Sequence, residues 1–328
     1  GTALAQVLAV NGNDVLLWGR NKEQMAEVAA KRENKKYLPD ILLHENLVIT
    51  SNWPVLNEYE FLLVSVPTQT QRELLQNHRE EFIQSNGILI NVAKGIETTT
   101  GKCVHEIYNE VLGDCSDRYV ALYGPSHAEE FGKNMPTALV SASANQFTAE
   151  SVQNIFMNDN VRVYTGNDVI GVELGGALKN IIALAIGMTV GLGYGDNARA
   201  ALMTRGLAEI TRLGVALGAE AYTFLGLTGV GDLIVTCTSQ HSRNRRAGIM
   251  LGEGMPLEEV LANMGMVVEG VATTKAAYAL AKEKHIEMPI LEEMYHVLFE
   301  HGDVKECTRK LMTRSKKGEH DDFVNTSN

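Results

Sequence analysis

The sequence has few cysteines, and none of them stands at metal-ligand spacing. Its 328 residues include four, namely Cys103, Cys115, Cys237 and Cys307. They are widely scattered, and no CxxC pair or His/Cys cluster accompanies them, which argues against a zinc site and against a disulfide framework. We therefore expect four free thiols, no bound metal and a reducing compartment.

The sequence also shows no strongly basic stretch, no signal peptide and no obvious membrane-spanning segment. Lysine and arginine number 29 against 40 aspartates and glutamates, a formal net charge of −11. This balance disfavours nucleic acid or an anionic membrane as the main partner, but it allows a locally basic pocket for an anionic substrate. We expect no apolar run to reach the ~18 residues that a membrane span requires, and no signal peptide is recognisable. These absences favour a cytoplasmic protein without integral membrane association.

What the sequence does contain is an alternation of strand-like and helix-like segments, followed by helices only. Strands are expected at 14–18, 47–50, 61–66, 87–92, 119–123, 138–140 and 161–163, with helices at 2–10, 21–31, 69–83, 102–112 and 148–157. Later segments at 171–190, 198–217, 256–264, 270–284 and 289–299 have helical periodicity. The pattern predicts an α/β domain with a parallel sheet at 1–165 and an all-helical domain at 166–328.

The chain opens on Gly1-Thr2-Ala3-Leu4 without a methionine, in a pattern typical of a helix start. Together with the strand expected at 14–18, this fits the first unit of a dinucleotide-binding fold, with Gly1 as the last glycine of G-x-G-x-x-G. In that interpretation the natural protein extends further, with a first strand and two more glycines. Any other βαβ unit would explain the same pattern.

Arg20 follows the strand expected at 14–18, where such folds contact the adenosine ribose. An acidic residue at this place binds the 2′-hydroxyl of NAD, whereas an arginine accommodates the 2′-phosphate of NADP. Arg20 therefore suggests that NADP is accepted. A solvated arginine after a strand is the alternative.

Two other strand ends carry polar residues. Lys94 and Gly95 follow the strand expected at 87–92, and ligands of open α/β sheets bind beyond such ends. Gly124-Pro125-Ser126 follows the strand at 119–123, where Ser126 and Glu129 have the spacing of a capping box. That turn is also a candidate part of the cofactor site, whereas the neighbouring His127 is interpreted as polar surface.

The strongest local signal is a row of glycines that leads to a lysine. Gly171, Gly175 and Lys179 are spaced four apart, so they share one face of a predicted helix. Because each glycine costs about 1 kcal/mol relative to alanine, the helix must gain a close approach of another backbone or of a flat ligand. We interpret this face as a ring-packing surface that ends in a reactive amine whose pKa is lowered by burial. Helix packing with a solvated lysine is the alternative.

Two further motifs complete the candidate site. Asp232 lies in an apolar stretch, where its burial requires a partner such as Lys179. A role as helix N-cap is the alternative and is compatible with that pairing. Ser242-Arg243-Asn244 opens a predicted helix, with Ser242 as its cap. Because first turns normally favour acidic residues, an arginine here predicts a bound anion such as a phosphate. A solvated charged face is again the alternative.

Taken together, these motifs resemble the bacterial-type NAD(P)-dependent glycerol-3-phosphate dehydrogenases. The resemblance extends from Gly1 to about Glu269. It rests on Gly1-Thr2-Ala3-Leu4-Ala5, Leu17-Trp18-Gly19-Arg20, Asn91-Val92-Ala93-Lys94-Gly95-Ile96-Glu97, Gly124-Pro125-Ser126-His127-Ala128, Gly175-Gly176-Ala177-Leu178-Lys179-Asn180, Gly231-Asp232-Leu233-Ile234 and Arg243-Asn244-Arg245. It implies a Rossmann-type domain followed by a helical domain similar to the C-terminal domain of 6-phosphogluconate dehydrogenase.

The resemblance also implies a role for individual residues. Lys179 is expected to be the acid/base in the reduction of dihydroxyacetone phosphate to sn-glycerol 3-phosphate, positioned by Asp232 and assisted by Lys94. Substrate contacts are expected from Lys94, Gly124, Ser126, Asn180, Asp232, Thr236, Ser242, Arg243 and Asn244. Contacts with NADP or NAD are expected from Gly1, Arg20, Lys94, Ala128, Arg243, Val267 and Glu269. The resemblance further implies that the protein forms a homodimer. It also implies that the glycerol 3-phosphate it makes supplies phospholipid synthesis.

Two other functions remain open at this point. A β-hydroxyacid dehydrogenase shares the domain plan and a lysine after glycines, but it would bind a carboxylate instead of a phosphate. A nucleotide-sensing module without turnover is the second alternative. The apolar surroundings of Lys179 and Asp232 argue against that module.

Overall fold

The structure, a computed structural model, describes residues 1–319 and divides the chain into two compact units. Unit 1 contains Gly1–Val66, Arg72–Ala93 and Tyr108–Asn167. Unit 2 contains Pro67–Gln71, Lys94–Ile107 and the chain from Asp168 onward. Two short segments of the first half of the sequence, one of which begins at Lys94, therefore belong to the same unit as the helical second half.

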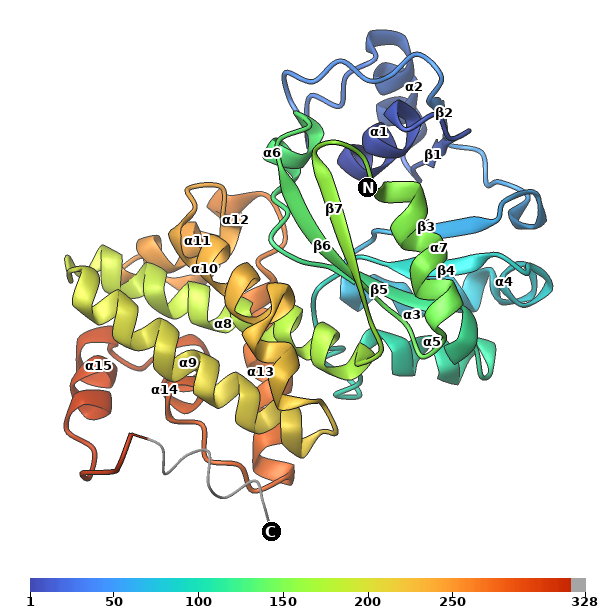
Figure 1. The fold of residues 1–328 in the computed structure, drawn as a ribbon. Helices are drawn as coiled ribbons and strands as arrows, with labels where there is room; N and C mark the ends of the chain where they lie inside the picture. The colour runs from blue at the N-terminus through green and yellow to red at the C-terminus, as the bar shows by residue number, and fades with distance from the viewer. Residues whose placement is uncertain (320–328) are drawn as a thin grey trace. The chain divides into compact units, whose positions relative to one another are not determined.

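Unit 1 is built on β-strands (Figure 1). A two-stranded parallel sheet pairs β1 (Leu16–Trp18) with β2 (Val48–Thr50). A five-stranded sheet has the order β3 (Phe61–Val64), β4 (Ile88–Asn91), β5 (Tyr119–Tyr123), β6 (Thr137–Ala142) and β7 (Val161–Gly166). The prediction of a parallel sheet is correct for every pair except β5 with β6, which is antiparallel. Apolar runs predict burial on both faces, but they do not encode the direction of a strand.

Most strands are separated by α-helices, as their alternation predicted, but only a short 3₁₀ helix, η1 (Leu56–Glu58), lies between β2 and β3. The α-helices of the first half of the chain are α1 (Thr2–Val10), α2 (Lys22–Lys31), α3 (Thr68–Asn77), α4 (Arg79–Gln84), α5 (Val104–Leu112), α6 (Ala128–Gly132) and α7 (Gln146–Phe156). The single helix predicted at 69–83 is wrong, because His78 has ψ of 27° and separates α3 from α4. Every residue of β5 is buried, which places this strand at the centre of the unit.

Unit 2 is helical over the part of the chain that the structure describes. Its elements are α8 (Val169–Gly191), α9 (Asp196–Ala216), η3 (Ala221–Leu225), η4 (Leu227–Gly231), α10 (Asp232–Thr238), α11 (Arg243–Gly252), α12 (Leu257–Met264), α13 (Glu269–Glu283), α14 (Pro289–Phe299) and α15 (Val304–Met312). The periodicity had not indicated η3, η4, α10 or α15. Of these, η4 and α10 carry the chemically important stretch around Asp232.

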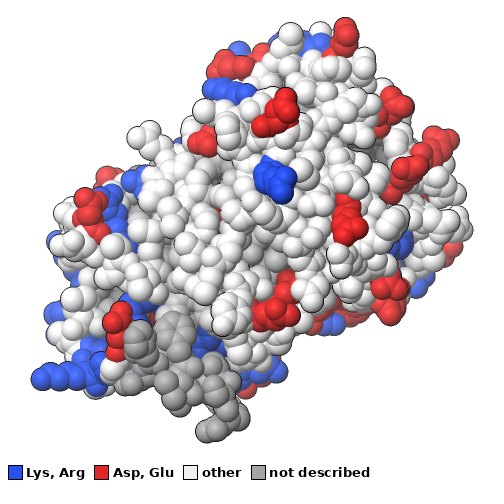
Figure 2. All heavy atoms as spheres, in the orientation of Figure 1, with Lys and Arg blue, Asp and Glu red and all other residues white. Residues whose placement is uncertain are grey.

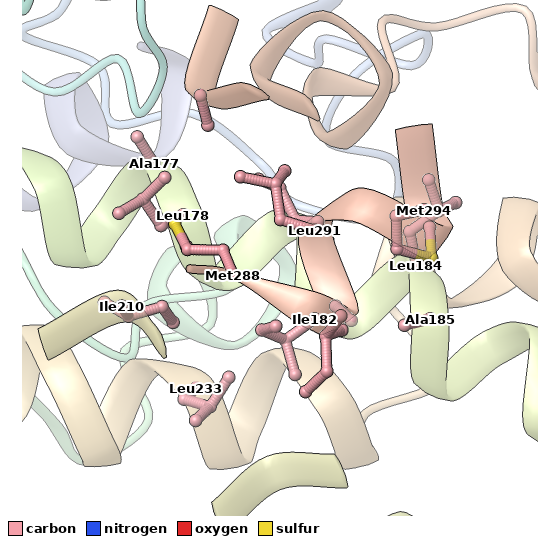
Figure 3. Packing of buried hydrophobic residues seen from close by; sticks show 14 of the residues in the cluster. Ala177, Leu178, Ile182, Leu184, Ala185, Ile210, Leu233, Met288, Leu291 and Met294 are labelled. Carbon is pink, nitrogen blue, oxygen red and sulfur yellow. The ribbon is translucent and has the colours of Figure 1, made fainter. Parts of the chain in front are cut away.

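Helix α8 forms the centre of unit 2. It is long and apolar enough to cross a membrane by composition, so the expectation that no such run exists is wrong. Most residues of this helix are buried inside the protein, which is typical of a core helix. Figure 3 shows Leu178, Ile182 and Leu184 of α8 within the apolar cluster that also contains Met288 and Leu291.

Helix α11 packs on α8 with almost no side chain between them. A Cβ atom at Gly248 would lie 2.1 Å from the carbonyl oxygen of Leu184, and one at Gly187 would lie 2.2 Å from that of Arg245. Both distances are shorter than real Cβ contacts, so glycine is required at each position. The two helices therefore touch through their backbones, which fixes the position of α11 relative to α8.

Charged side chains are dispersed over one face of the protein (Figure 2). Acidic and basic side chains are interspersed on the face that Figure 2 shows, and much of its middle is uncharged. The formal net charge of the sequence is −11.

Candidate functional site

The candidate site in unit 2 centres on a buried aspartate held by two lysines. Lys179 of α8 donates to Asp232 Oδ1 at 2.5 Å, and Lys94 donates to Asp232 Oδ2 at 2.6 Å. Lys179 also donates to Thr236 Oγ1 at 2.6 Å. Asp232 is only 1% exposed and Lys179 only 5%. The predicted contact between Asp232 and Lys179 is confirmed, and both carboxylate oxygens have a cationic partner.

Burial and pairing shift the pKa of both groups. Desolvation lowers the pKa of Lys179 to about 8, although the charge of Asp232 acts in the opposite direction. Burial tends to raise the pKa of Asp232, but the two lysines outweigh it and hold that pKa below its usual value. Near neutral pH the site therefore combines an ionised carboxylate with an amine that can release and regain a proton.

Local backbone geometry places Asp232 against Lys179. Residues Leu227–Gly231 form a π-helical turn, a form often found at functional sites. Gly229 within it is indispensable, since a Cβ there would lie 1.9 Å from the carbonyl oxygen of Phe224. Asp232 is the first residue of α10, and the N-cap of this helix is Gly231. The alternative role of Asp232 as an N-cap is therefore wrong, because its carboxylate faces the lysines.

The glycine face of α8 has a different partner from the one expected. A Cβ at Gly175 would lie 2.7 Å from the carbonyl oxygen of Thr228, so the π-helical turn packs directly on this face. The interpretation as a surface for a flat ligand is wrong at Gly175, where the close approach of another backbone explains the glycine. This packing brings the turn that precedes Asp232 against the turn of α8 that precedes Lys179.

The first turn of α11 forms a hydrogen-bonded bridge between helices. Ser242 Oγ accepts from the backbone N–H of Arg245, which confirms its predicted role as a cap. Asn244 donates to Asn180 Oδ1 at 2.9 Å and accepts from the N–H of Gly270 at 2.8 Å. Asn180 directly follows Lys179, so this bridge links the first turn of α11 to the lysine. No acidic residue lies in that turn, and Arg243 is exposed there.

Residues expected to contact the cofactor lie nearby in unit 2. Arg243 Nη1 donates to the carbonyl oxygen of Val267 at 3.1 Å. Glu269, the first residue of α13, has a carboxylate oxygen, Oε2, that is buried without a hydrogen-bond partner. Burying a carboxylate oxygen without a hydrogen-bond donor costs free energy, and a ligand that donates to it removes that cost. The amide-bearing nicotinamide of NAD or NADP supplies such donors, so the residues present fit this cofactor.

The remaining expected residues lie in unit 1. Gly1 is the N-cap of α1, whose first turn has neither a side-chain cap nor an acidic residue, as suits an anion at its N–H groups. Arg20 is exposed two residues beyond the end of β1. Gly124 has φ of 146° and is buried at the end of β5. Ala128 is the exposed first residue of α6.

The capping box predicted at Ser126 and Glu129 is wrong. The N-cap of α6 is His127, without a side-chain capping bond, and Ser126 Oγ donates to the carbonyl oxygen of Gly124 at 3.1 Å. The helix starts one residue later than the spacing suggested. The hydroxyl of Ser126 thus stabilises the turn after β5 and leaves the helix end uncapped.

Sequence reasoning missed one residue of this region, Thr68. It is fully buried and is the first residue of α3. Its backbone lies close to the carboxylate of Glu269 and acts to lower the pKa of that group. The available signal was its position two residues beyond the apolar run that ends at Val66, because ligands of α/β sheets bind beyond strand ends.

Comparison with known proteins identifies the family. The family described as NAD-dependent glycerol-3-phosphate dehydrogenase matches with its N-terminal part at residues 1–149 and with its C-terminal part at 168–309. Glycerol-3-phosphate dehydrogenase (NAD(P)+) of Geobacillus kaustophilus is 54% identical over 327 residues, 99% of this chain and 95% of the relative. The corresponding protein of Desulfitobacterium hafniense is 52% identical over 97% of this chain and 90% of the relative.

Solved structures agree with this assignment. The crystal structure of glycerol-3-phosphate dehydrogenase from Coxiella burnetii superposes with a TM-score of 0.91 at 36% identity, covering 95% of each chain. A structure of D-mandelate dehydrogenase reaches a TM-score of 0.61 at 12% identity, covering 93% of this chain and 95% of that one, which shows a shared fold alone. With both family parts matched and relatives above 50% identity, the chain belongs to the NAD-dependent glycerol-3-phosphate dehydrogenases.

Proposed function

We propose that this protein reduces dihydroxyacetone phosphate to sn-glycerol 3-phosphate, reversibly, with Lys179 as the acid/base. The observation that carries the proposal is the buried group of Lys179, Asp232 and Lys94. A bound reduced nicotinamide supplies the two electrons and one hydrogen that the ketone carbon takes up. The protein must supply the second hydrogen, as a proton on the carbonyl oxygen.

Lys179 is equipped to deliver that proton. Asp232 and Thr236 accept two of the three N–H groups of its ammonium, so the third is left to point at a substrate oxygen. As the carbonyl oxygen gains negative charge, the ammonium stabilises it and transfers a proton to it. In the reverse direction the neutral amine takes the proton from the hydroxyl. Lys94 fixes the second oxygen of Asp232 and adds positive charge beside the reacting oxygen.

The phosphate of the substrate is assigned to the first turn of α11. Backbone N–H groups at a helix start and an adjacent guanidinium together bind phosphate well. Ser242, Arg243 and Asn244 occupy this turn, and Asn244 connects it to Asn180 beside the reactive lysine. Gly124 and Ser126 are further proposed substrate contacts, and Thr236 acts by orienting Lys179.

Several finer properties belong to the same proposal. Gly1, Arg20, Lys94, Ala128, Arg243, Val267 and Glu269 are the proposed cofactor contacts. Arg20 supports acceptance of NADP beside NAD, since a guanidinium suits a 2′-phosphate. We further propose that the protein is cytoplasmic, that it forms a homodimer, and that its product supplies phospholipid synthesis. The burial of α8, the one long apolar helix among residues 1–319, is consistent with a protein that is not inserted in a membrane.

The first test measures the oxidation of NADPH and of NADH by absorbance. We expect turnover with dihydroxyacetone phosphate and a loss of at least 100-fold in kcat/KM with unphosphorylated dihydroxyacetone, because the phosphate contacts are then unused. Arg20→Ala should weaken the binding of NADPH more than the binding of NADH. Turnover of β-hydroxyacids instead, or tight cofactor binding with no turnover in a folded protein, contradicts the proposal.

The second test follows the reaction between pH 7 and pH 9.5. Reduction requires protonated Lys179, so kcat/KM for dihydroxyacetone phosphate should fall above the lysine pKa of about 8. The fall should approach tenfold per pH unit. Oxidation of glycerol 3-phosphate requires the neutral amine and should rise through the same pH. Profiles that are flat in both directions over this range would exclude Lys179 as the acid/base.

A further inference from the structure

Two buried oxygen atoms of unit 2 lack hydrogen-bond partners and lie beside the same glycine. They are Oγ1 of Thr68 and Oε2 of Glu269. A Cβ atom at Gly95 would lie 2.7 Å from the first and 3.2 Å from the second. Gly95 directly follows Lys94, which pairs with Asp232. Two uncompensated polar atoms are therefore concentrated next to the proposed catalytic group.

The two oxygens differ in what they can do. A threonine hydroxyl can donate a hydrogen bond, whereas a carboxylate oxygen only accepts. The backbone of Thr68 lies near the carboxylate of Glu269 and acts to lower its pKa, so the two residues are close neighbours. Burial raises the pKa of Glu269 although Arg243 acts to lower it, as expected for a carboxylate short of donors.

A primary carboxamide is complementary to this pair. Its NH2 group donates and its carbonyl oxygen accepts, and the two ends are held in one plane at a fixed spacing. We propose that Thr68 and Glu269 together bind the carboxamide of the nicotinamide ring, with the NH2 group donating to Glu269 and the Thr68 hydroxyl donating to the carboxamide oxygen. Glu269 is partly exposed, so the pair lies near enough to the surface for a ring to approach it.

This inference rests on the proposed cofactor and adds Thr68 as a residue that selects it. Glycine at position 95 is part of the arrangement, because any side chain there would displace one of the two oxygens. The pair fixes the edge of the ring that bears the carboxamide, and with it the face of the ring presented to the substrate. Thr68 is a positioning residue in this role and takes no part in proton transfer.

The test compares equilibrium binding of three dinucleotides by calorimetry. NADH carries the carboxamide, its acetylpyridine analogue keeps the carbonyl but lacks the NH2 group, and adenosine diphosphoribose lacks the ring. Thr68→Val removes the hydroxyl and keeps the side-chain shape. We expect this substitution to weaken the binding of NADH and of the acetylpyridine analogue about tenfold. The binding of adenosine diphosphoribose should weaken less than twofold. Thr68→Ser, which restores a hydroxyl, should recover most of the affinity.

Glu269→Gln provides the matched second variant. This substitution should weaken the binding of NADH severalfold. The affinity for the acetylpyridine analogue should stay nearly unchanged, because that analogue has no NH2 group to donate. Equal weakening of all three ligands by Thr68→Val, or no weakening of NADH, overturns the inference. The outcome is independent of the proposed reaction, because a protein that fails to turn over dihydroxyacetone phosphate can still show this binding pattern, and an active one can fail to show it.

Discussion

Lys179→Met should lower kcat for dihydroxyacetone phosphate by about 1,000-fold, a typical effect of removing a positioned acid/base. The methionine fills a similar volume but can neither donate a proton nor stabilise negative charge on the substrate oxygen. The fold should survive, because Asp232 keeps Lys94 as a partner at 2.6 Å and is not left as an isolated buried charge. Steady-state kinetics together with a thermal unfolding curve measure the two effects separately.

The control for this variant is Lys275→Met. Lys275 is an exposed lysine on α13, so the same substitution there should leave kcat within twofold of the parent. Near-normal turnover of Lys179→Met, in a protein with an unchanged unfolding curve, would refute the assigned role. Loss of turnover accompanied by loss of the fold would instead identify Lys179 as structural.

Gly248→Ala should destabilise unit 2 by about 3 kcal/mol, at the upper end for overpacked positions. The added methyl group would lie 2.1 Å from the carbonyl oxygen of Leu184, and a backbone atom cannot rotate away as a side chain can. Helices α8 and α11 would have to separate. Because α11 begins with the proposed phosphate contacts and α8 carries Lys179, the KM for dihydroxyacetone phosphate should rise as well. Urea unfolding and substrate titration check these two expectations.

Gly195→Ala is the matched glycine control. Gly195 has φ of −84°, and apart from its chain neighbours no residue has an atom within 4 Å of where its Cβ would be. Alanine there should change the free energy of unfolding by less than about 1 kcal/mol. If Gly248→Ala were as mild as this control, the backbone contact between α8 and α11 would not be the constraint that we describe.

Much of the candidate site followed from local sequence. The pairing of Asp232 with Lys179 was expected because a charge in an apolar stretch needs a partner, and the cap at Ser242 was expected from its residue type before a helix. The capping box at Ser126 failed because its spacing fits more than one helix start. Thr68 was missed because nothing in its neighbourhood indicates that its hydroxyl is buried next to Glu269.

The sequence by itself determined the alternation of strands and helices in the first half of the chain and the purely helical pattern of the second half. It also determined which residue types are available for chemistry. These features depend on periodicity and turn chemistry within a few residues of each position. The tertiary structure alone decided the direction of β6, the backbone that packs against Gly175, and the contact of Lys94 with an aspartate 138 residues away. Such contacts depend on how distant segments pack, and a short pattern is compatible with many packings.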